Sequence, residues 1–143
     1  SELETFAASI VLRPDAIGMV TALKEKGWHI VLLSGSVDLI VAAIANRIGA
    51  NDWRACSKLI FDDSGKLSDI VSSGDEADAK IKIASDYLAQ NNISIENAVA
   101  IGDGGNDIEL FKTMKGILVG QNEKLKAIAW KQVDNLSEIP GLI

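Results

Sequence analysis

The sequence predicts an α/β fold built on a parallel β-sheet. Short, continuous apolar runs alternate along the chain with segments of helical periodicity, and this alternation is typical of βα units. Polar, glycine-containing segments directly follow two of these runs, as expected where parallel strands end and helices begin. The length of 143 residues suits a single domain over residues 1–143, and 48% hydrophobic residues can supply its core.

Three apolar runs are the expected strands. Each is short and mostly β-branched or aliphatic, as strands covered on both faces must be. They are Trp28–Leu33, Ala98–Ile101 and Gly116–Val119. The one histidine, His29, lies within the first run, so we expect it to be buried and structural.

Four further segments carry apolar residues at helical spacing. They are Asp15–Lys26, Val37–Ile48, Ala77–Gln90 and Asp107–Met114. Gly27 and Gly49 follow the first two and are the expected helix stops. One segment, Leu59–Val71, breaks the alternation, and its centre, Asp62-Asp63-Ser64-Gly65, predicts a β-hairpin with a glycine-containing turn.

Charge and cysteine content limit the partners. Fourteen basic against 20 acidic residues give a net charge of −6, which disfavours binding to nucleic acid and to anionic membranes. A small phosphorylated metabolite held in a local cationic site is compatible with this balance. The lone cysteine, Cys56, allows no internal disulfide and no thiolate metal cluster. We therefore expect a cytoplasmic protein.

The strongest chemical signal is the loop Gly102–Asp107, which follows an expected strand and opens a helix. Glycines let the backbone approach a ligand, and the carboxylates of Asp103 and Asp107 suit Mg²⁺. A dinucleotide fingerprint is excluded because an aspartate holds its third glycine position. An EF-hand is excluded because Ile108 and Met114 replace its glycine and glutamate. The alternative without a function is a turn in which Asp107 caps the helix.

Two weaker signals accompany this loop. Ser34-Gly35-Ser36 lies between a strand and a helix, where a hydroxyl and backbone N–H groups can bind an anion. The alternative there is a serine that caps the helix. Lys80 lies near a helix start, where its positive charge is unfavourable beside the helix dipole, so it is a candidate site residue. The alternative is that Lys80 is an ordinary solvated charge on the surface. By local rules alone, the alternatives are favoured at both places.

In this order along the chain, the three signals resemble the haloacid dehalogenase-like (HAD) phosphohydrolase superfamily, and within it the phosphoserine phosphatase branch. The Ser34 segment resembles the second motif of that branch, and Ala79-Lys80 resembles the third. The loop Gly102–Asp107 resembles the fourth and is the most specific. The hairpin Leu59–Val71 also has a counterpart there. The resemblance implies a HAD-like, Rossmann-like three-layer core with a parallel sheet and a small β-hairpin.

The resemblance implies how phosphate is bound. Ser34 and the Gly35 amide hold the phosphoryl group, and Lys80 offsets its negative charge, as phosphoryl transfer requires. Lys82 lies two residues beyond Lys80 and is the alternative site lysine.

The resemblance also implies a metal site. Asp103 ligates Mg²⁺, and Asn106 contacts phosphate or the network around the metal. Asp107 orients Lys80 or supports the metal.

The family's nucleophile is what the sequence lacks. The family reaction passes through an aspartyl-phosphate formed on a strand-end Asp-x-Asp-x-Thr motif, and the 143 residues contain no such motif. Asp62-Asp63 cannot be this motif because it comes after the serine motif in the chain. The one upstream candidate, Ser9–Asp15, has Arg13-Pro14 in place of the nucleophile. The family's helical cap is also mostly absent, and residues 1–11 are interpreted as a remnant of the cap or linker.

The nucleophile strand is central in the family fold, so its absence would leave a slot in the sheet with unpaired backbone groups. We therefore expect this chain to be the C-terminal portion of a longer phosphatase and to be inactive by itself. The rival hypothesis is a natural short homologue in which residues 7–12, or a second chain, supplies a strand.

The expected function is Mg²⁺-dependent hydrolysis of a small phosphomonoester, with phosphoserine as the leading substrate. The alternative is a non-catalytic phosphate- or metal-binding module, or an interaction subunit with a degenerate HAD fold.

Overall fold

The computed structural model describes residues 2–143, apart from the side chains of Glu76 and Ala77. The chain divides into two compact units, Ser1–Gly74 and Asp75–Ile143. Helices and strands alternate through most of the chain, so the predicted α/β class is confirmed. The expectation of a single domain over residues 1–143 stays a prediction.

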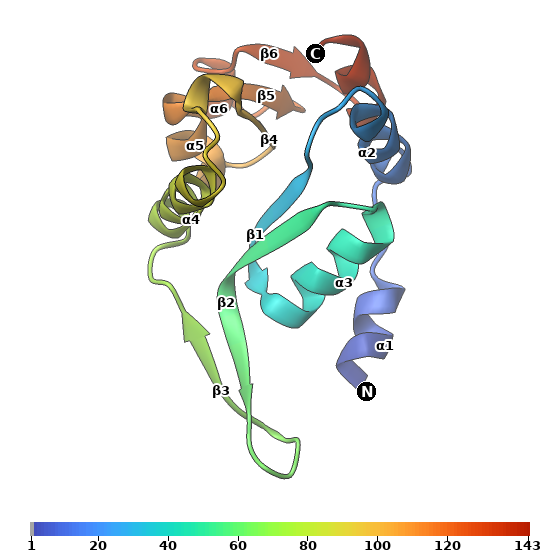
Figure 1. Cartoon of the computed structure of the whole chain (residues 1–143), viewed down its shortest axis with the longest axis vertical. Helices are drawn as coiled ribbons and strands as arrows, with labels where there is room; N and C mark the ends of the chain where they lie inside the picture. The colour runs from blue at the N-terminus through green and yellow to red at the C-terminus, as the bar shows by residue number, and fades with distance from the viewer. Residues whose placement is uncertain (1) are drawn as a thin grey trace. The chain divides into compact units, whose positions relative to one another are not determined.

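The first unit contains a three-stranded mixed sheet in the order β1-β2-β3 (Figure 1). Its strands are β1 (Val31–Val37), β2 (Asp52–Phe61) and β3 (Leu67–Ser72). The first part of β2 pairs in parallel with β1, and its second part pairs antiparallel with β3. A single long strand therefore belongs both to the parallel sheet and to the hairpin.

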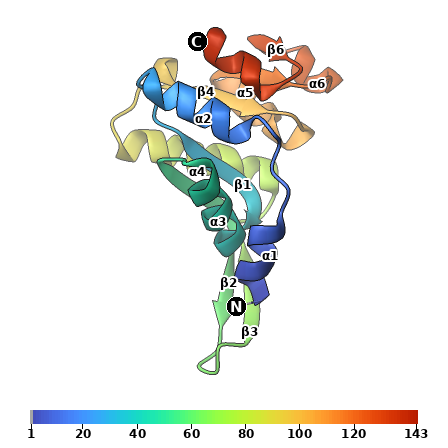
Figure 2. The ribbon, with the colours of Figure 1, turned by 90° about the vertical axis from the view of Figure 1, so that its right-hand side faces the viewer.

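Three helices accompany this sheet: α1 (Glu2–Ser9), α2 (Ala16–Glu25) and α3 (Asp38–Ile48). The buried face of α3 carries Val41, Ala45 and Ile48 at the spacing that one helix face requires. Helix α1 lies beside α3 (Figure 2). Arg47 donates hydrogen bonds to the carbonyls of Ala7 at 3.0 Å and Ile10 at 2.8 Å. Since eight residues make a marginal helix in water, α3 supplies the contacts that stabilise α1.

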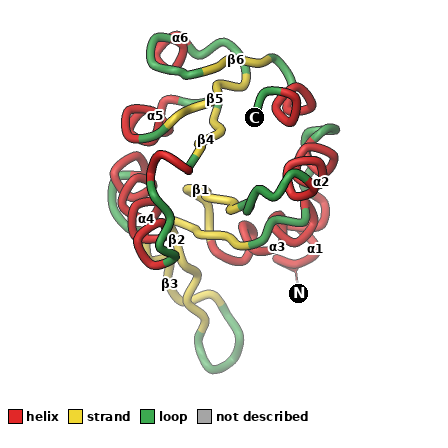
Figure 3. The backbone as a smooth tube through the Cα atoms, turned by 45° about the horizontal axis from the view of Figure 1, so that its top comes forward, coloured by secondary structure: helices red, strands yellow, loops and turns green. Residues whose placement is uncertain are grey.

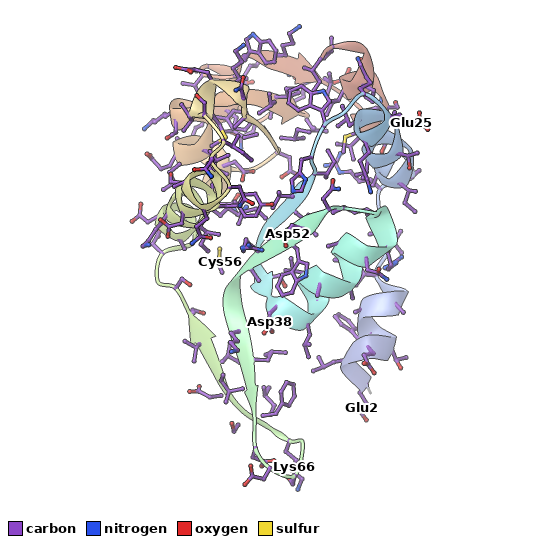
Figure 4. The ribbon with its side chains drawn as sticks, in the orientation of Figure 1. Glu2, Glu25, Asp38, Asp52, Cys56 and Lys66 are labelled. Atoms are coloured by element: carbon purple, nitrogen blue, oxygen red, sulfur yellow. The ribbon has the colours of Figure 1, made fainter. Side chains whose placement is uncertain are left out.

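The hairpin turn is built as its sequence predicts. The Asp62 carboxylate accepts hydrogen bonds from the backbone N–H groups of Ser64 at 2.9 Å and Lys66 at 3.0 Å. The Ser64 hydroxyl bond, followed by the Lys66 amide bond, lowers the pKa of Asp62. Gly65 has a φ of 80°, which glycine adopts without steric cost. Figure 4 shows Lys66 at the tip of this hairpin.

The second unit contains a parallel sheet in the order β4-β5-β6, visible in Figure 3. Its strands are β4 (Val99–Gly102), β5 (Lys115–Val119) and β6 (Lys131–Val133). Its helices are α4 (Glu76–Gln90), α5 (Ile108–Thr113) and α6 (Glu123–Lys126), with short 3₁₀ turns at Ile95–Asn97, Gly105–Asp107 and Leu136–Gly141. Ile117, Leu118, Leu125 and Ile139 are fully buried and form the centre of its core.

The first strand begins later than its apolar run predicts. The strand runs over Val31–Val37, not Trp28–Leu33, and His29 is exposed before it begins. The reason is the end of α2: the Trp28 N–H bonds back to the Leu23 carbonyl at 3.0 Å, and Gly27 has a φ of 91°. This pattern closes a helix and delays the strand.

Other expected elements occur with small shifts at their ends. Strand β6 has only three residues, and the apolar runs predict neither this strand nor the parallel first part of β2. Among the helices over residues 2–143, none is both long and apolar enough to cross a membrane.

Gly116 gives a test of the second unit's packing. A Cβ atom at this position would collide with the Phe111 ring, which α5 lays against β5. We expect Gly116→Ala to lower the free energy of unfolding by about 1–3 kcal/mol, as overpacking does. Urea denaturation followed by circular dichroism measures this.

The matched control is Gly18→Ala in α2, where a Cβ meets nothing within 4 Å. That variant should gain up to about 1 kcal/mol from helix propensity. Equal stability of the two variants would contradict the packing argument.

Candidate active site

The loop after β4 is organised around the carboxylate of Asp107. Strand β4 ends at Gly102, a 3₁₀ turn spans Gly105–Asp107, and α5 begins at the next residue. Oδ2 of Asp107 lies 3.3 Å from the backbone N of Asp103 and 3.4 Å from that of Gly104, and both N–H groups donate to it. The Asp107 side chain thus fixes the backbone of its own loop immediately before α5.

The other oxygen of this carboxylate receives Lys80 from α4. Nζ of Lys80 donates to Oδ1 of Asp107 at 3.1 Å, and both side chains are only 9% exposed. Lys82, the alternative site lysine, bonds instead to Asp86 on the same helix, and its side chain is 75% exposed. The structure therefore brings together Lys80 and Asp107, which lie 27 residues apart in the sequence.

Gly102 makes this arrangement possible. A Cβ atom there would collide with the Asp107 carboxylate. The last residue of β4 must therefore be glycine for Asp107 to reach the backbone N–H groups of its own loop. Gly102 belongs to the expected motif Gly102–Asp107, and this close approach to Asp107 is the structural reason for it.

Ser34 and Gly35 lie in the first unit, at the carboxyl end of β1. The parallel register with β2 runs from Val31 to Ser34, shifts, and resumes at Val37. The segment between these points is thus a β-bulge, a feature that often occurs beside active sites. The residue that begins α3 is Asp38, and its N-cap is Val37, with no side-chain capping bond. The expected alternative, a serine that caps the helix, is therefore wrong.

One positioning residue was missed by the sequence analysis. Oδ1 of Asp38, labelled in Figure 4, accepts a hydrogen bond from the backbone N–H of Leu59 in β2 at 3.2 Å. It also accepts from the N–H of Leu39 at 2.9 Å. This carboxylate ties the start of α3 to β2, immediately after the bulge. The sequence signal that could have identified Asp38 is its position as an acidic residue in the first turn of a predicted helix.

The remaining expected metal-site residues lie in the loop of the second unit. Asp103 is exposed, and Asn106 is half-buried in the 3₁₀ turn. Among the described residues there is no group of three or more His, Cys, Asp or Glu that could hold a metal. Asp103 with Asp107 still fits Mg²⁺, which needs only one or two protein carboxylates. Because both oxygens of Asp107 already accept hydrogen bonds, Asp103 is the better direct ligand.

A parallel α/β sheet with a polar loop after a strand, next to a buried lysine–aspartate pair, defines a class of ligand-binding α/β proteins. The chain belongs to the haloacid dehalogenase-like hydrolase family, whose model matches residues 1–112.

Within that family, several similar proteins are named phosphoserine phosphatase. A phosphoserine phosphatase of Idiomarina loihiensis is 30% identical over 156 residues, covering 100% of this chain and 66% of the relative. A phosphoserine phosphatase of Methanocaldococcus jannaschii is 31% identical over 93 residues, covering 65% of this chain and 44% of the relative. A solved phospho-aspartyl intermediate analogue of phosphoserine phosphatase has a TM-score of 0.82 and 30% identity, covering 98% of this chain and 68% of that one.

The chain spans only part of these relatives. It covers 44%, 37% and 66% of three curated phosphoserine phosphatases, the second being that of Archaeoglobus fulgidus. The HAD family and the phosphoserine phosphatase-like branch are thus shown by a match to part of each relative's length.

The buried ion pair can be tested by a double-mutant cycle. We expect Lys80→Met and Asp107→Asn each to destabilise the protein by about 3–5 kcal/mol, because each leaves a buried charge without its counter-charge. The double variant should lose clearly less than the sum, which measures the coupling. Chemical denaturation of the four proteins gives these values.

Lys82→Met is the control, because it removes an equivalent charge from an exposed pair. Its cost should stay below about 1 kcal/mol. Additive effects of the two buried substitutions would contradict the pairing.

Proposed function

We propose that this chain forms most of the catalytic core of a Mg²⁺-dependent phosphatase that acts on a small phosphomonoester, with phosphoserine as the leading substrate. The observation that carries the proposal is the buried Lys80–Asp107 pair held by the Gly102–Asp107 loop. Burial of such a pair contributes little net stability, so a function is the better reason for it. The relatives named phosphoserine phosphatase support the substrate.

The roles of the second unit follow from charge. Lys80, held in one orientation by Asp107, offsets the negative charge of the phosphoryl group. Asp103 ligates Mg²⁺, which neutralises phosphate oxygens when bound, and Asn106 supports this network. Asp107 acts as a positioning residue, because its two oxygens already hold Lys80 and its own loop.

The roles of the first unit follow from hydrogen-bond donors. The Ser34 hydroxyl and the Gly35 N–H bind phosphoryl oxygens at the bulge near the carboxyl end of β1. Donors positioned in advance are what phosphoryl transfer needs, since the protein supplies mainly orientation and charge stabilisation.

The nucleophile comes from outside these 143 residues. In the proposed reaction an aspartate oxygen attacks phosphorus, the ester P–O bond breaks, and the leaving alkoxide takes a proton from a general acid or from water. Water then attacks the aspartyl-phosphate, which releases inorganic phosphate and a proton and restores the carboxylate. A solved relative at 30% identity is described as a phospho-aspartyl intermediate analogue, which supports this route. Among the described strands, β1 pairs only with β2, and β4 pairs only with β5. Each has an edge that a further strand, covalent or from a second chain, can join.

The metal assignment is tested by activity. Protein expressed from its complete reading frame should hydrolyse p-nitrophenyl phosphate with Mg²⁺ and lose this activity on addition of EDTA. Asp103→Asn should lower kcat/KM by about a thousandfold or more, because the metal supplies several kcal/mol of charge stabilisation. Asp134→Asn, which changes a carboxylate bonded to Gln121, is the control and should keep full activity.

Unchanged turnover in Asp103→Asn would refute the metal assignment. The same assay on the 143-residue chain should give no hydrolysis, because its sequence contains no Asp-x-Asp-x-Thr motif.

A non-catalytic phosphate- or metal-binding module is the second candidate, favoured by that same missing motif. Phosphate and Mg²⁺ binding without turnover by the complete protein would select it. In either case we propose a cytoplasmic protein with a small phosphorylated partner, in keeping with a net charge of −6 and one cysteine.

A further inference from the structure

We propose that the Ser36 hydroxyl is a second hydroxyl donor to the bound phosphoryl group, beside that of Ser34. The inference rests on the proposed phosphatase function and deepens it. It assigns a further binding residue, one that the sequence analysis placed in the segment but gave no role.

The register of β1 against β2 leaves two residues of β1 outside regular pairing. Ser34 pairs with Ala55 and Val37 pairs with Ser57, so two residues of β1, Gly35 and Ser36, lie opposite the single residue Cys56. Parallel ladders rarely contain such bulges, and a bulge turns its side chains out of the regular alternation. The bulge therefore releases Gly35 and Ser36 from strand pairing at the end of β1 where the phosphate site is proposed.

The second argument is that Ser36 has no structural task for its hydroxyl. It does not cap α3, since the N-cap is Val37 without a side-chain bond, and Asp38 bonds the first turn. Within the part of the chain that the structure describes, the Ser36 side chain makes no hydrogen bond, and the residue is exposed. Alanine or glycine would serve the fold equally well at this position.

The third argument is the state of Ser34. The backbone N–H of Ser36 donates to Oγ of Ser34 at 3.2 Å. The Ser34 oxygen is thus occupied as an acceptor, which leaves its own hydrogen to be donated to an anion. Ser36 therefore positions one hydroxyl through its backbone and adds another through its side chain. A phosphate dianion has oxygens enough to accept both.

The test compares variants of protein expressed from its complete reading frame. We expect Ser36→Ala to raise KM for p-nitrophenyl phosphate by about tenfold or more, because a hydrogen bond to a charged group is lost. The inhibition constant of inorganic phosphate should rise equally. The value of kcat should change less than about twofold, because the lost bond is present in both ground and transition states. Ser36→Thr, which keeps a hydroxyl, should retain low KM.

The control is Ser68→Ala, which removes an exposed hairpin hydroxyl that bonds only to the Ile60 carbonyl. It should leave both kinetic constants unchanged. The midpoint of thermal unfolding should be the same for Ser36→Ala and wild type, which separates binding from a structural effect.

The outcomes distinguish this inference from the function beneath it. If Ser34→Ala weakens phosphate binding while Ser36→Ala and Ser36→Gly leave it unchanged, this inference is wrong and the proposed function stands. If Ser34→Ala and Asp103→Asn are both fully active, the proposed function itself fails. A raised KM in Ser36→Thr equal to that in Ser36→Ala would also overturn the hydroxyl's role.

Discussion

The buried carboxylate of Asp107 is the interaction on which the candidate site of the second unit depends. One of its oxygens binds Lys80, and the other accepts two backbone N–H groups of its own loop. Removing two charges from water costs free energy, which is offset only when each lone pair finds a donor. Gly102 is required because any side chain there would occupy the space of this carboxylate. Loop, helix α4 and the end of β4 are therefore fixed by one side chain.

Backbone hydrogen bonding imposes the second constraint. Strands β1 and β4 each pair with one described neighbour, and the other edge of each has no partner among the described strands. Ile101 on β4, an outer strand of the described sheet β4-β5-β6, is 38% exposed although it is apolar. The same two strands carry the residues of both candidate binding segments at their carboxyl ends. An edge that can accept a further strand thus lies beside each set of candidate site residues.

The Ser34–Ser36 segment and the Gly102–Asp107 loop are held in place by different interactions. In the first unit, a bulge frees Gly35 and Ser36 from the ladder, and Asp38 fastens the following helix to β2. In the second unit, a 3₁₀ turn and a buried ion pair hold the loop. In both segments, a side-chain carboxylate accepts hydrogen bonds from backbone N–H groups. Backbone polar groups near a strand end are satisfied in this way.

The sequence by itself determined the α/β class, the hairpin and the motif residues, because apolar periodicity and glycine-rich strand ends are local signals. It misplaced the first strand, since the Trp28 bond that closes α2 is invisible in a periodicity. Local rules favoured a serine that caps the helix over one that binds an anion. Position at the helix start favoured Lys80 over Lys82, with Lys82 left as the alternative. Tertiary structure shows that Val37, not a serine, is the N-cap of α3, and that Lys80 is buried against Asp107 whereas Lys82 is solvated. The burial of Lys80 depends on a contact between residues far apart in the chain, which no local pattern records.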